Sequence, residues 1–265
     1  MSDFLAYGFV QRALLTGTLL GVTCAVLSFF VVLRRMAFVG IGLSHAALGG
    51  VALGVVLGAP PLLAAAVFTT FVAWVVGWIR GRSEVSEDTA IGVFFPASMA
   101  LGVVLISLSP AYRQDLMGYL FGNILSVRPG EVLPLALISL VGLGLVGWFF
   151  KELLYLGVDE EAAQAAGIPA DRLHYLLLTL LAVTIVAALR LVGIVLVSAF
   201  LVIPAATGQA IARSLGGMLA IAIGSAVASV LGGLWLSWMW DLPSGAAIVL
   251  VSASLFFVAI ALGRR

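Results

Sequence analysis

Long apolar segments, each about the length of a membrane-crossing helix, follow one another along this chain of 265 residues. A helix needs roughly 20 consecutive apolar residues to cross a bilayer, and charged residues interrupt the chain at about that interval. The segments are residues 10–33, 36–58, 61–79, 89–109, 131–150, 173–190, 191–212, 217–240 and 245–262. Because they are continuous and do not alternate in polarity, they predict helices and not the strands of a membrane barrel. We expect an all-α membrane protein of about nine transmembrane helices, a single domain over residues 1–265.

The composition leaves little room for anything besides these segments. Apolar residues make up 63% of the chain and charged residues 9%, against about 45–50% and about 25% in soluble domains. This excludes a soluble catalytic domain, so we predict no enzyme activity. The net charge of +1 offers no basic surface for nucleic acid. A phosphate-binding GxxxxGK[ST] motif is also missing, so ATP would have to be used by another chain.

The positions of lysine and arginine predict the orientation. With nine spans and a cytoplasmic C-terminus, the N-terminus is outside, and the cytoplasmic side holds Arg34, Arg35, Arg80, Arg82, Lys151, Arg172, Arg213, Arg264 and Arg265. The outside then holds Arg12, Arg113, Arg128 and Arg190. Nine basic residues against four favour this orientation, whereas eight spans, the alternative, would reverse one half of the chain and remove the bias.

Two loops are longer than turns. Residues 110–130 are expected outside the membrane and contain a segment too short to span it, which we predict to form a short helix at the outer surface. Residues 151–172 are expected on the cytoplasmic side, where the acids Asp159, Glu160 and Glu161 favour a helix N-terminus and Gly167 with Pro169 favours its end. That short helix is interpreted either as a docking element for a partner or as a plain solvated loop.

Two spans contain residues that interrupt helices. Residues 36–58 carry six glycines, and the seventh span carries Pro204, so both are expected to be broken. They occupy the second position of the two halves, spans 1–4 and spans 6–9. Broken helices at matching positions are typical of transporters built from inverted repeats, which makes an inverted repeat a hypothesis for this chain.

His45 is the titratable side chain that we expect at membrane depth. Ionisable groups at that depth usually serve a function. A neutral imidazole binds divalent transition metals, so His45 is a candidate metal ligand. The alternative is a structural histidine that hydrogen-bonds to a helix carbonyl. The twelve acids all fall in loops or at span ends. That distribution argues against a transporter driven by protons or sodium alone, which generally needs carboxylates within its spans.

Four stretches, in order, resemble the permease subunit of the zinc, manganese and iron ABC importers, the ABC-3 family. They are RRMAFVGIGLSHAALGGVALG at 34–54, DLMGYLFGNILSV at 115–127, RLVGIVLVSAFLVIPAATGQAIAR at 190–213 and DLPSGAAIVL at 241–250. The similarity covers nearly the whole chain. It implies a type II importer-like permease in the plasma membrane of a prokaryote, with zinc, manganese or iron as the cargo.

The resemblance also implies partners and site residues. The family's permeases form a homodimer with two cytoplasmic ATP-binding subunits, which carry the ATP, and with an extracytoplasmic receptor that delivers the metal. No cofactor is expected on this chain. The implied contacts with the ATPase are Glu160, Glu161, Ala162, Ala163 and Gly167, in a coupling helix at 159–168. The translocation path is predicted to include Ser44, His45, Asn123 and Pro204, and receptor docking to involve Arg113 and Asp115.

One departure from the family's pattern bears on the cargo. Relatives commonly carry Asp-x-x-x-His in the second span, and Ile41 stands at the aspartate position here. They also often carry a histidine in the fourth span, which reads GVFFPAS at 92–98 in this chain. Alternatives therefore stay open: the cargo is a metal chelate or another small solute, the chain transports alone without ATP, or it is a scaffold without transport activity.

Overall fold

The structure, a computed structural model, describes residues 7–83, 85–107, 122 and 124–263. Its long helices are α2 (Gly8–Leu33), α3 (Ala37–Val56), α4 (Pro61–Arg82), α5 (Glu87–Ser107), α7 (Pro129–Trp148), α10 (Ala170–Phe200), α12 (Leu215–Trp240) and α13 (Ser244–Gly263). Shorter helices are η2 (Ile124–Ser126), α8 (Phe150–Val158), α9 (Glu160–Ala165) and α11 (Ile203–Ile211). Within these residues nine helical segments are long and apolar enough to cross a membrane, which confirms the all-α, nine-span prediction.

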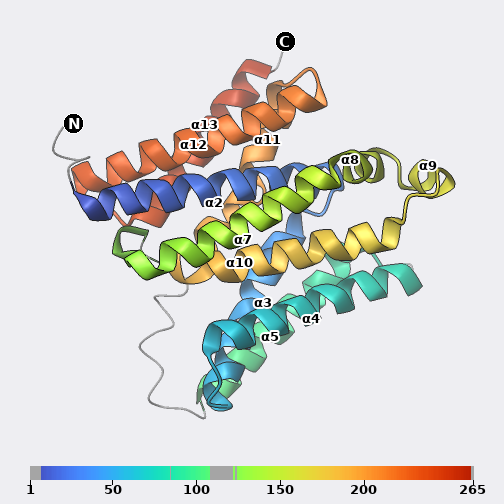
Figure 1. Cartoon of the computed structure of the whole chain (residues 1–265), viewed down its shortest axis with the longest axis horizontal. Helices are drawn as coiled ribbons and strands as arrows, with labels where there is room; N and C mark the ends of the chain where they lie inside the picture. Colours follow the sequence, from blue (N-terminus) through green and yellow to red (C-terminus); the bar gives the residue numbers. More distant parts are fainter. Residues whose placement is uncertain (1–6, 84, 108–121, 123, 264–265) are drawn as a thin grey trace.

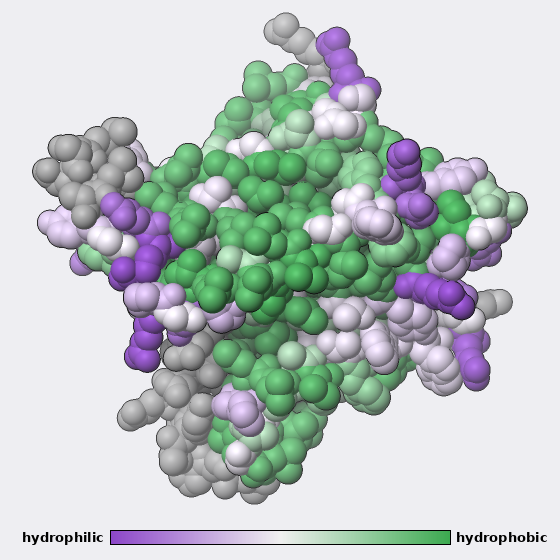
Figure 2. All heavy atoms as spheres, viewed as in Figure 1, coloured by the Kyte–Doolittle hydropathy of each residue, from purple (hydrophilic) through white to green (hydrophobic). Residues whose placement is uncertain are grey.

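The helices form two neighbouring groups (Figure 1). α2 packs against α12, α7 and α10, while α3 packs against α5, α4 and α10. α10 therefore contacts both groups. Figure 2 shows an apolar band across the middle of the molecule and charged residues gathered at its two ends, the distribution expected of a chain whose central belt faces lipid. We call the end that carries α8 and α9 the α9 end.

The second span differs from expectation, because α3 is one continuous helix despite its glycines. Gly49, Gly50 and Gly54 lie against the backbone of neighbouring segments. A Cβ at Gly49 would come within 2.7 Å of the Ser98 carbonyl oxygen on α5, and one at Gly50 within 2.6 Å of Ala65 Cα on α4. Small residues allow such close approach in membranes. The glycines thus serve packing, and the broken-helix signature of an inverted repeat is present in the second half alone.

The interruption of the seventh span is confirmed, and it has two parts. Within α10, Gly193 adopts φ 76° and ψ 167°, which is not helical. The chain then leaves α10 at Leu201 and begins α11 at Ile203, with Pro204 in its first turn, where a proline ring is tolerated because no amide hydrogen is needed. Two consecutive breaks thus separate the first part of α10 from α11.

The loop at 151–172 contains the predicted short helix. Asp159 caps α9, since its Oδ1 accepts from the Ala162 amide at 2.9 Å, and Gly167 follows the helix with φ 81°. The sequence prediction missed α8, which occupies the first part of the loop and buries Leu153 and Leu156. Only one face of α8 is apolar, so α8 lacks the continuous apolar stretch that predicts a membrane span.

Candidate functional site

His45 lies on the least buried face of α3. Residues 38, 41 and 45 recur at helical spacing on one side of the helix, and Phe38 is 59% exposed while Ile41 and His45 are half-buried. The imidazole contacts the Phe95 ring of α5 edge-on, with 4.6 Å between ring centroids. A half-open face within an otherwise packed helix is where a solute or another protein surface would meet this chain.

The hydrogen bond of His45 determines which of its nitrogens remains available. Nδ1 lies 2.9 Å from the Ile41 carbonyl oxygen, and because a carbonyl only accepts, Nδ1 carries the hydrogen. In the neutral ring Nε2 then holds a lone pair suited to a metal ion. The structure thus shows the bond to a helix carbonyl, and the metal-ligand role of Nε2 stays a prediction.

The other residues predicted for the path occupy different surroundings. Ser44 is fully buried, and its hydroxyl donates to the Gly40 carbonyl at 2.7 Å. Pro204 is buried at the start of α11. α3 contacts the break between α10 and α11 at Gly40, where an added Cβ would lie 3.1 Å from the Leu201 side chain. Asn123, Arg113 and Asp115 fall outside the described residues.

Gly122, the described residue next to Asn123, lies directly on the break in α10. A Cβ at Gly122, which has φ 54°, would collide with the backbone of Val192 and Gly193. Two glycines from distant parts of the chain therefore bring their backbones into contact at the point where α10 leaves helical geometry. Any movement of one segment has to be accommodated by the other, because interiors packed this closely cannot deform smoothly.

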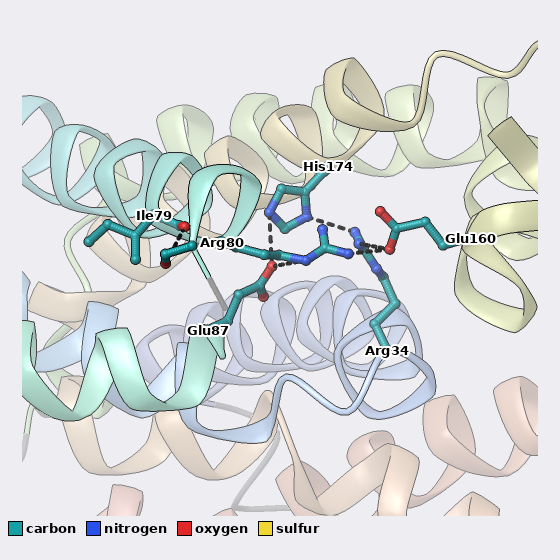
Figure 3. Close-up of polar contacts among 7 residues, drawn as sticks. Arg34, Ile79, Arg80, Glu87, Glu160 and His174 are labelled. Carbon is teal, nitrogen blue, oxygen red and sulfur yellow. Dashed lines mark hydrogen bonds and ion pairs between the residues drawn. The ribbon is translucent and has the colours of Figure 1, made fainter. Parts of the chain in front are cut away.

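The predicted ATPase-contacting residues divide into two sets. Glu161 and Gly167 are exposed, and Ala162 is partly exposed. Ala163, within α9, is fully buried. The carboxylate of Glu160 is directed toward the ends of α2 and α4 (Figure 3), so its contacts in this chain are with arginines of the helix bundle.

The Asp159 cap yields a test of α9. Replacing an N-cap acceptor by alanine costs about 1 kcal/mol, so we expect Asp159→Ala to raise hydrogen exchange at the Ala162 amide about fivefold. Asp159→Asn keeps an acceptor oxygen and is the matched control. Equal exchange in the alanine variant and the unmodified protein would show that α9 does not depend on this cap.

A closed network of charged groups lies at the α9 end (Figure 3). Glu160 Oε2 contacts Arg80 Nη2 and lies 3.5 Å from Arg34 Nη2. Arg80 Nε lies 3.2 Å from Glu87 Oε1. His174 completes the circuit, with Nε2 3.0 Å from Glu87 Oε1 and Nδ1 2.8 Å from Arg34 Nη1. We call these five residues the five-residue ring, and they join α9, α4, α5, α10 and the end of α2.

The ring is neutral as a whole. An arginine only donates hydrogen bonds, so Nδ1 of His174 accepts from Arg34. The imidazole hydrogen of His174 is then on Nε2, which faces Glu87. Two arginines and two glutamates then balance. Burial and the neighbouring charge of Arg80 lower the pKa of Arg34, while Glu87 and Glu160 oppose that shift. An uncompensated charge would be costly here, because the side chains of Arg34, Glu87 and His174 are at most 8% exposed.

A cavity of about 790 Å³ adjoins the ring and is lined by Arg34, Arg80, Glu87 and Glu160 among other residues. Glu160 and Arg80 are each 31% exposed, in contrast to the buried remainder of the ring. The contact between α9 and α4 is therefore the part of the network that water reaches. Ion pairs of this kind are weak and easily exchanged.

His174 is the functional candidate that sequence reasoning missed, since His45 alone was singled out. The sequence did carry a signal for it, a histidine near the start of a span that follows Asp171 and Arg172. Its partners Arg34 and Glu87 are distant in sequence, with 140 residues separating Arg34 from His174, and no local pattern connects them.

The described residues contain no group of three or more histidines, cysteines, aspartates or glutamates placed to hold a metal ion. His45 is thus an isolated candidate ligand within the described part of this chain. The described residues thus present a half-open helix face with one candidate ligand nitrogen, a break within α10 and another between α10 and α11, and a charged network beside α9.

Comparison with known proteins places these features in a family. The ABC 3 transport family matches residues 6–263. The chain is 38% identical over 259 residues to the manganese transport system membrane protein MntC of Listeria innocua, covering 98% of this chain and 92% of that protein. It is 37% identical over 248 residues to the high-affinity zinc uptake system membrane protein ZnuB of Haemophilus influenzae, covering 94% and 95%.

The fold has a solved counterpart as well. The structure of PsaBC from Streptococcus pneumoniae in complex with Fab superimposes with a TM-score of 0.86 at 35% identity, covering 97% of this chain and 94% of that one. Both sequence and fold therefore match over nearly the full length of the chain.

Proposed function

The chain belongs to the ABC 3 transport family, and on that premise we propose that it is the permease subunit of an importer for manganese, zinc or iron. The observation that carries the proposal is the full-length match to membrane proteins of manganese and zinc uptake systems. The chain provides a route through the membrane and performs no bond chemistry. ATP is bound and hydrolysed on two partner subunits, and a receptor outside the cell delivers the metal.

A second copy of this chain completes the path. The face of α3 that carries Phe38, Ile41 and His45 is half-open, and Val93 of the adjacent α5 is 64% exposed. In a homodimer with these faces inward, the two His45 side chains would line a shared route. Two imidazoles with no carboxylate form a weak site, which suits a cargo that has to leave again.

The orientation follows from the basic residues at the α9 end. Arg34, Arg80 and Lys151 lie there, so this end faces the cytoplasm and the ATPases by the positive-inside rule. With nine spans the N-terminus is outside, in the inner membrane of a bacterium. The exposed residues of α9 and its C-terminal turn, Glu161 and Gly167, are then available to an ATPase.

One observation favours a second candidate cargo. Ile41 removes the carboxylate that would accompany His45 one turn away, and manganese in particular prefers oxygen ligands. A metal chelate or another small solute would not need that carboxylate. Transport of the bare ion and transport of a chelate are separated by the uptake assay below.

Replacing His45 tests the proposal directly. In cells that express the complete transporter, we expect His45→Ala to reduce uptake of the preferred metal at least about tenfold, equivalent to about 1.4 kcal/mol, because the ligand atom Nε2 is lost. Uptake of radioactive manganese, zinc and iron is measured at trace concentration.

Ile41→Ala is the matched control, since it opens the same face of α3 without removing a ligand atom. Unchanged uptake of all three metals in His45→Ala would contradict the metal-ligand role. Uptake of a metal only when it is supplied as a chelate would favour the second cargo.

A further inference from the structure

The five-residue ring connects the helix that an ATPase would move to the helices that line the proposed path. α9 lies against α8 and α10, and Ala163 anchors its buried side. Glu160, its first residue, contacts Arg80 in the last turn of α4. Arg80 in turn contacts Glu87, the first residue of α5. Two consecutive ion pairs therefore couple α9 to α4 and to the start of α5.

From Glu87 the connection continues along a single helix. Phe95 lies eight residues further along α5, about 12 Å at 1.5 Å per residue, and its ring contacts His45. α5 is pressed onto α3 at Gly49, where a Cβ would come within 2.7 Å of the Ser98 carbonyl oxygen. Because interiors packed this closely transmit strain, we expect a shift at Glu87 to reach His45.

The ring also has a firm part and a labile part. Glu87, His174 and Arg34 are buried and in contact with one another through His174, so they hold the start of α5 against α10 and the end of α2. Glu160 and Arg80 are 31% exposed and border the cavity of about 790 Å³. The pair that joins α9 can therefore break and re-form beside open space, while the remainder stays in place.

We infer that the five-residue ring transmits the movement of α9 to α5, with Glu160 acting on the bundle through Arg80 rather than on the ATPase. Glu160 is thus a positioning residue. Glu87 and His174 form the buried part of the same network, which holds the start of α5 in place. The inference rests on the proposed function, because the force on α9 comes from the ATPase subunits proposed above. It assigns a role to His174 and Glu87, which the transport path does not use.

The test breaks the labile pair without removing a buried charge. In the complete transporter reconstituted in lipid vesicles, Glu160→Gln is compared with Asp171→Asn, an exposed acid at the same end that is not in the ring. We expect Glu160→Gln to keep its ATPase subunits through purification and to lose at least about tenfold in manganese, zinc or iron taken up per ATP hydrolysed. Asp171→Asn should resemble the unmodified protein.

A second pair of variants tests the same contact from α4, with the conservative change Arg80→Lys as the check on folding. Arg80→Gln breaks the ring from the α4 side and should give the same loss, while Arg80→Lys keeps the charge and should recover part of the uptake per ATP. Wild-type uptake per ATP in both Glu160→Gln and Arg80→Gln would overturn the inference. So would loss of the ATPase subunits from Glu160→Gln, because Glu160 would then be a docking residue.

A distance measurement tests, independently of the cargo, whether the five-residue ring transmits the movement of α9 to α5. Spin labels at Val103→Cys on α5 and Leu231→Cys on α12, both exposed, report the position of α5. ATP binding should change their separation in the unmodified ring and leave it unchanged in Glu160→Gln. An equal change in both, or none in either, refutes transmission through the ring, whereas a normal change without uptake of any metal counts against the proposed cargo alone.

Discussion

Gly193→Ala is expected to abolish transport and to lower the stability of the permease by about 2 kcal/mol. Gly193 has φ 76° and ψ 167°, a backbone region that is essentially restricted to glycine and strained by about 1–3 kcal/mol for other residues. Alanine favours helical geometry, so α10 would tend to continue through the break and shift the segment from Ile194 to α11. The contact with the backbone of Gly122 would be lost at the same time.

Two measurements on the purified protein check this expectation. The thermal unfolding midpoint should fall by about 5 °C or more, and metal uptake should fall to background. Gly224→Ala on α12 is the control, because a Cβ there meets nothing within 4 Å and its backbone is helical. Full uptake by Gly193→Ala would mean that the break is not part of the transport route.

Gly49→Val is expected to separate α3 from α5 and to leave little folded protein. Its Cβ would come within 2.7 Å of the Ser98 carbonyl oxygen and 3.3 Å of the Phe68 ring. Because the first contact is backbone, no side-chain rotation relieves it, and we expect a loss at the upper end of the overpacking range, about 3 kcal/mol. The contact between His45 and Phe95 across the same two helices would open.

The amount of monodisperse protein recovered in detergent is the measurement for this variant, followed by metal uptake in whatever folds. Gly144→Val on α7 adds the same side chain where nothing lies within 4 Å of the Cβ, and it should be recovered normally. Equal recovery of the two variants would show that α3 and α5 can part without loss.

Much of the fold could be predicted because its signals are local. Apolar segments between charged residues predict spans, since a bilayer accepts no unpaired backbone, and the nine spans were confirmed. The cap at Asp159 and the stop at Gly167 predicted α9 for the same reason, because each acts within a few residues. Pro204 likewise marked the break before α11.

The continuity of α3 could not be predicted from its glycines. A glycine either loosens a helix or lets another backbone approach, and the choice depends on which helix lies opposite. Here the backbones of α4 and α5 lie within contact of Gly50 and Gly49, so packing prevails over the weak helix propensity of glycine. The partner helices begin 11 and 38 residues further along the chain, outside any local pattern.

By itself, then, the sequence determined that this chain is a helical membrane protein, and it located His45 and the α9 loop. These conclusions rest on hydrophobicity, caps and charge distribution, which act over a few residues or one span. Only the tertiary structure decided that Glu160 faces the bundle and that His174 joins Arg34 and Glu87 in one ring. Ion pairs form between side chains that folding brings together from different helices, so their partners cannot be read from any one stretch of sequence.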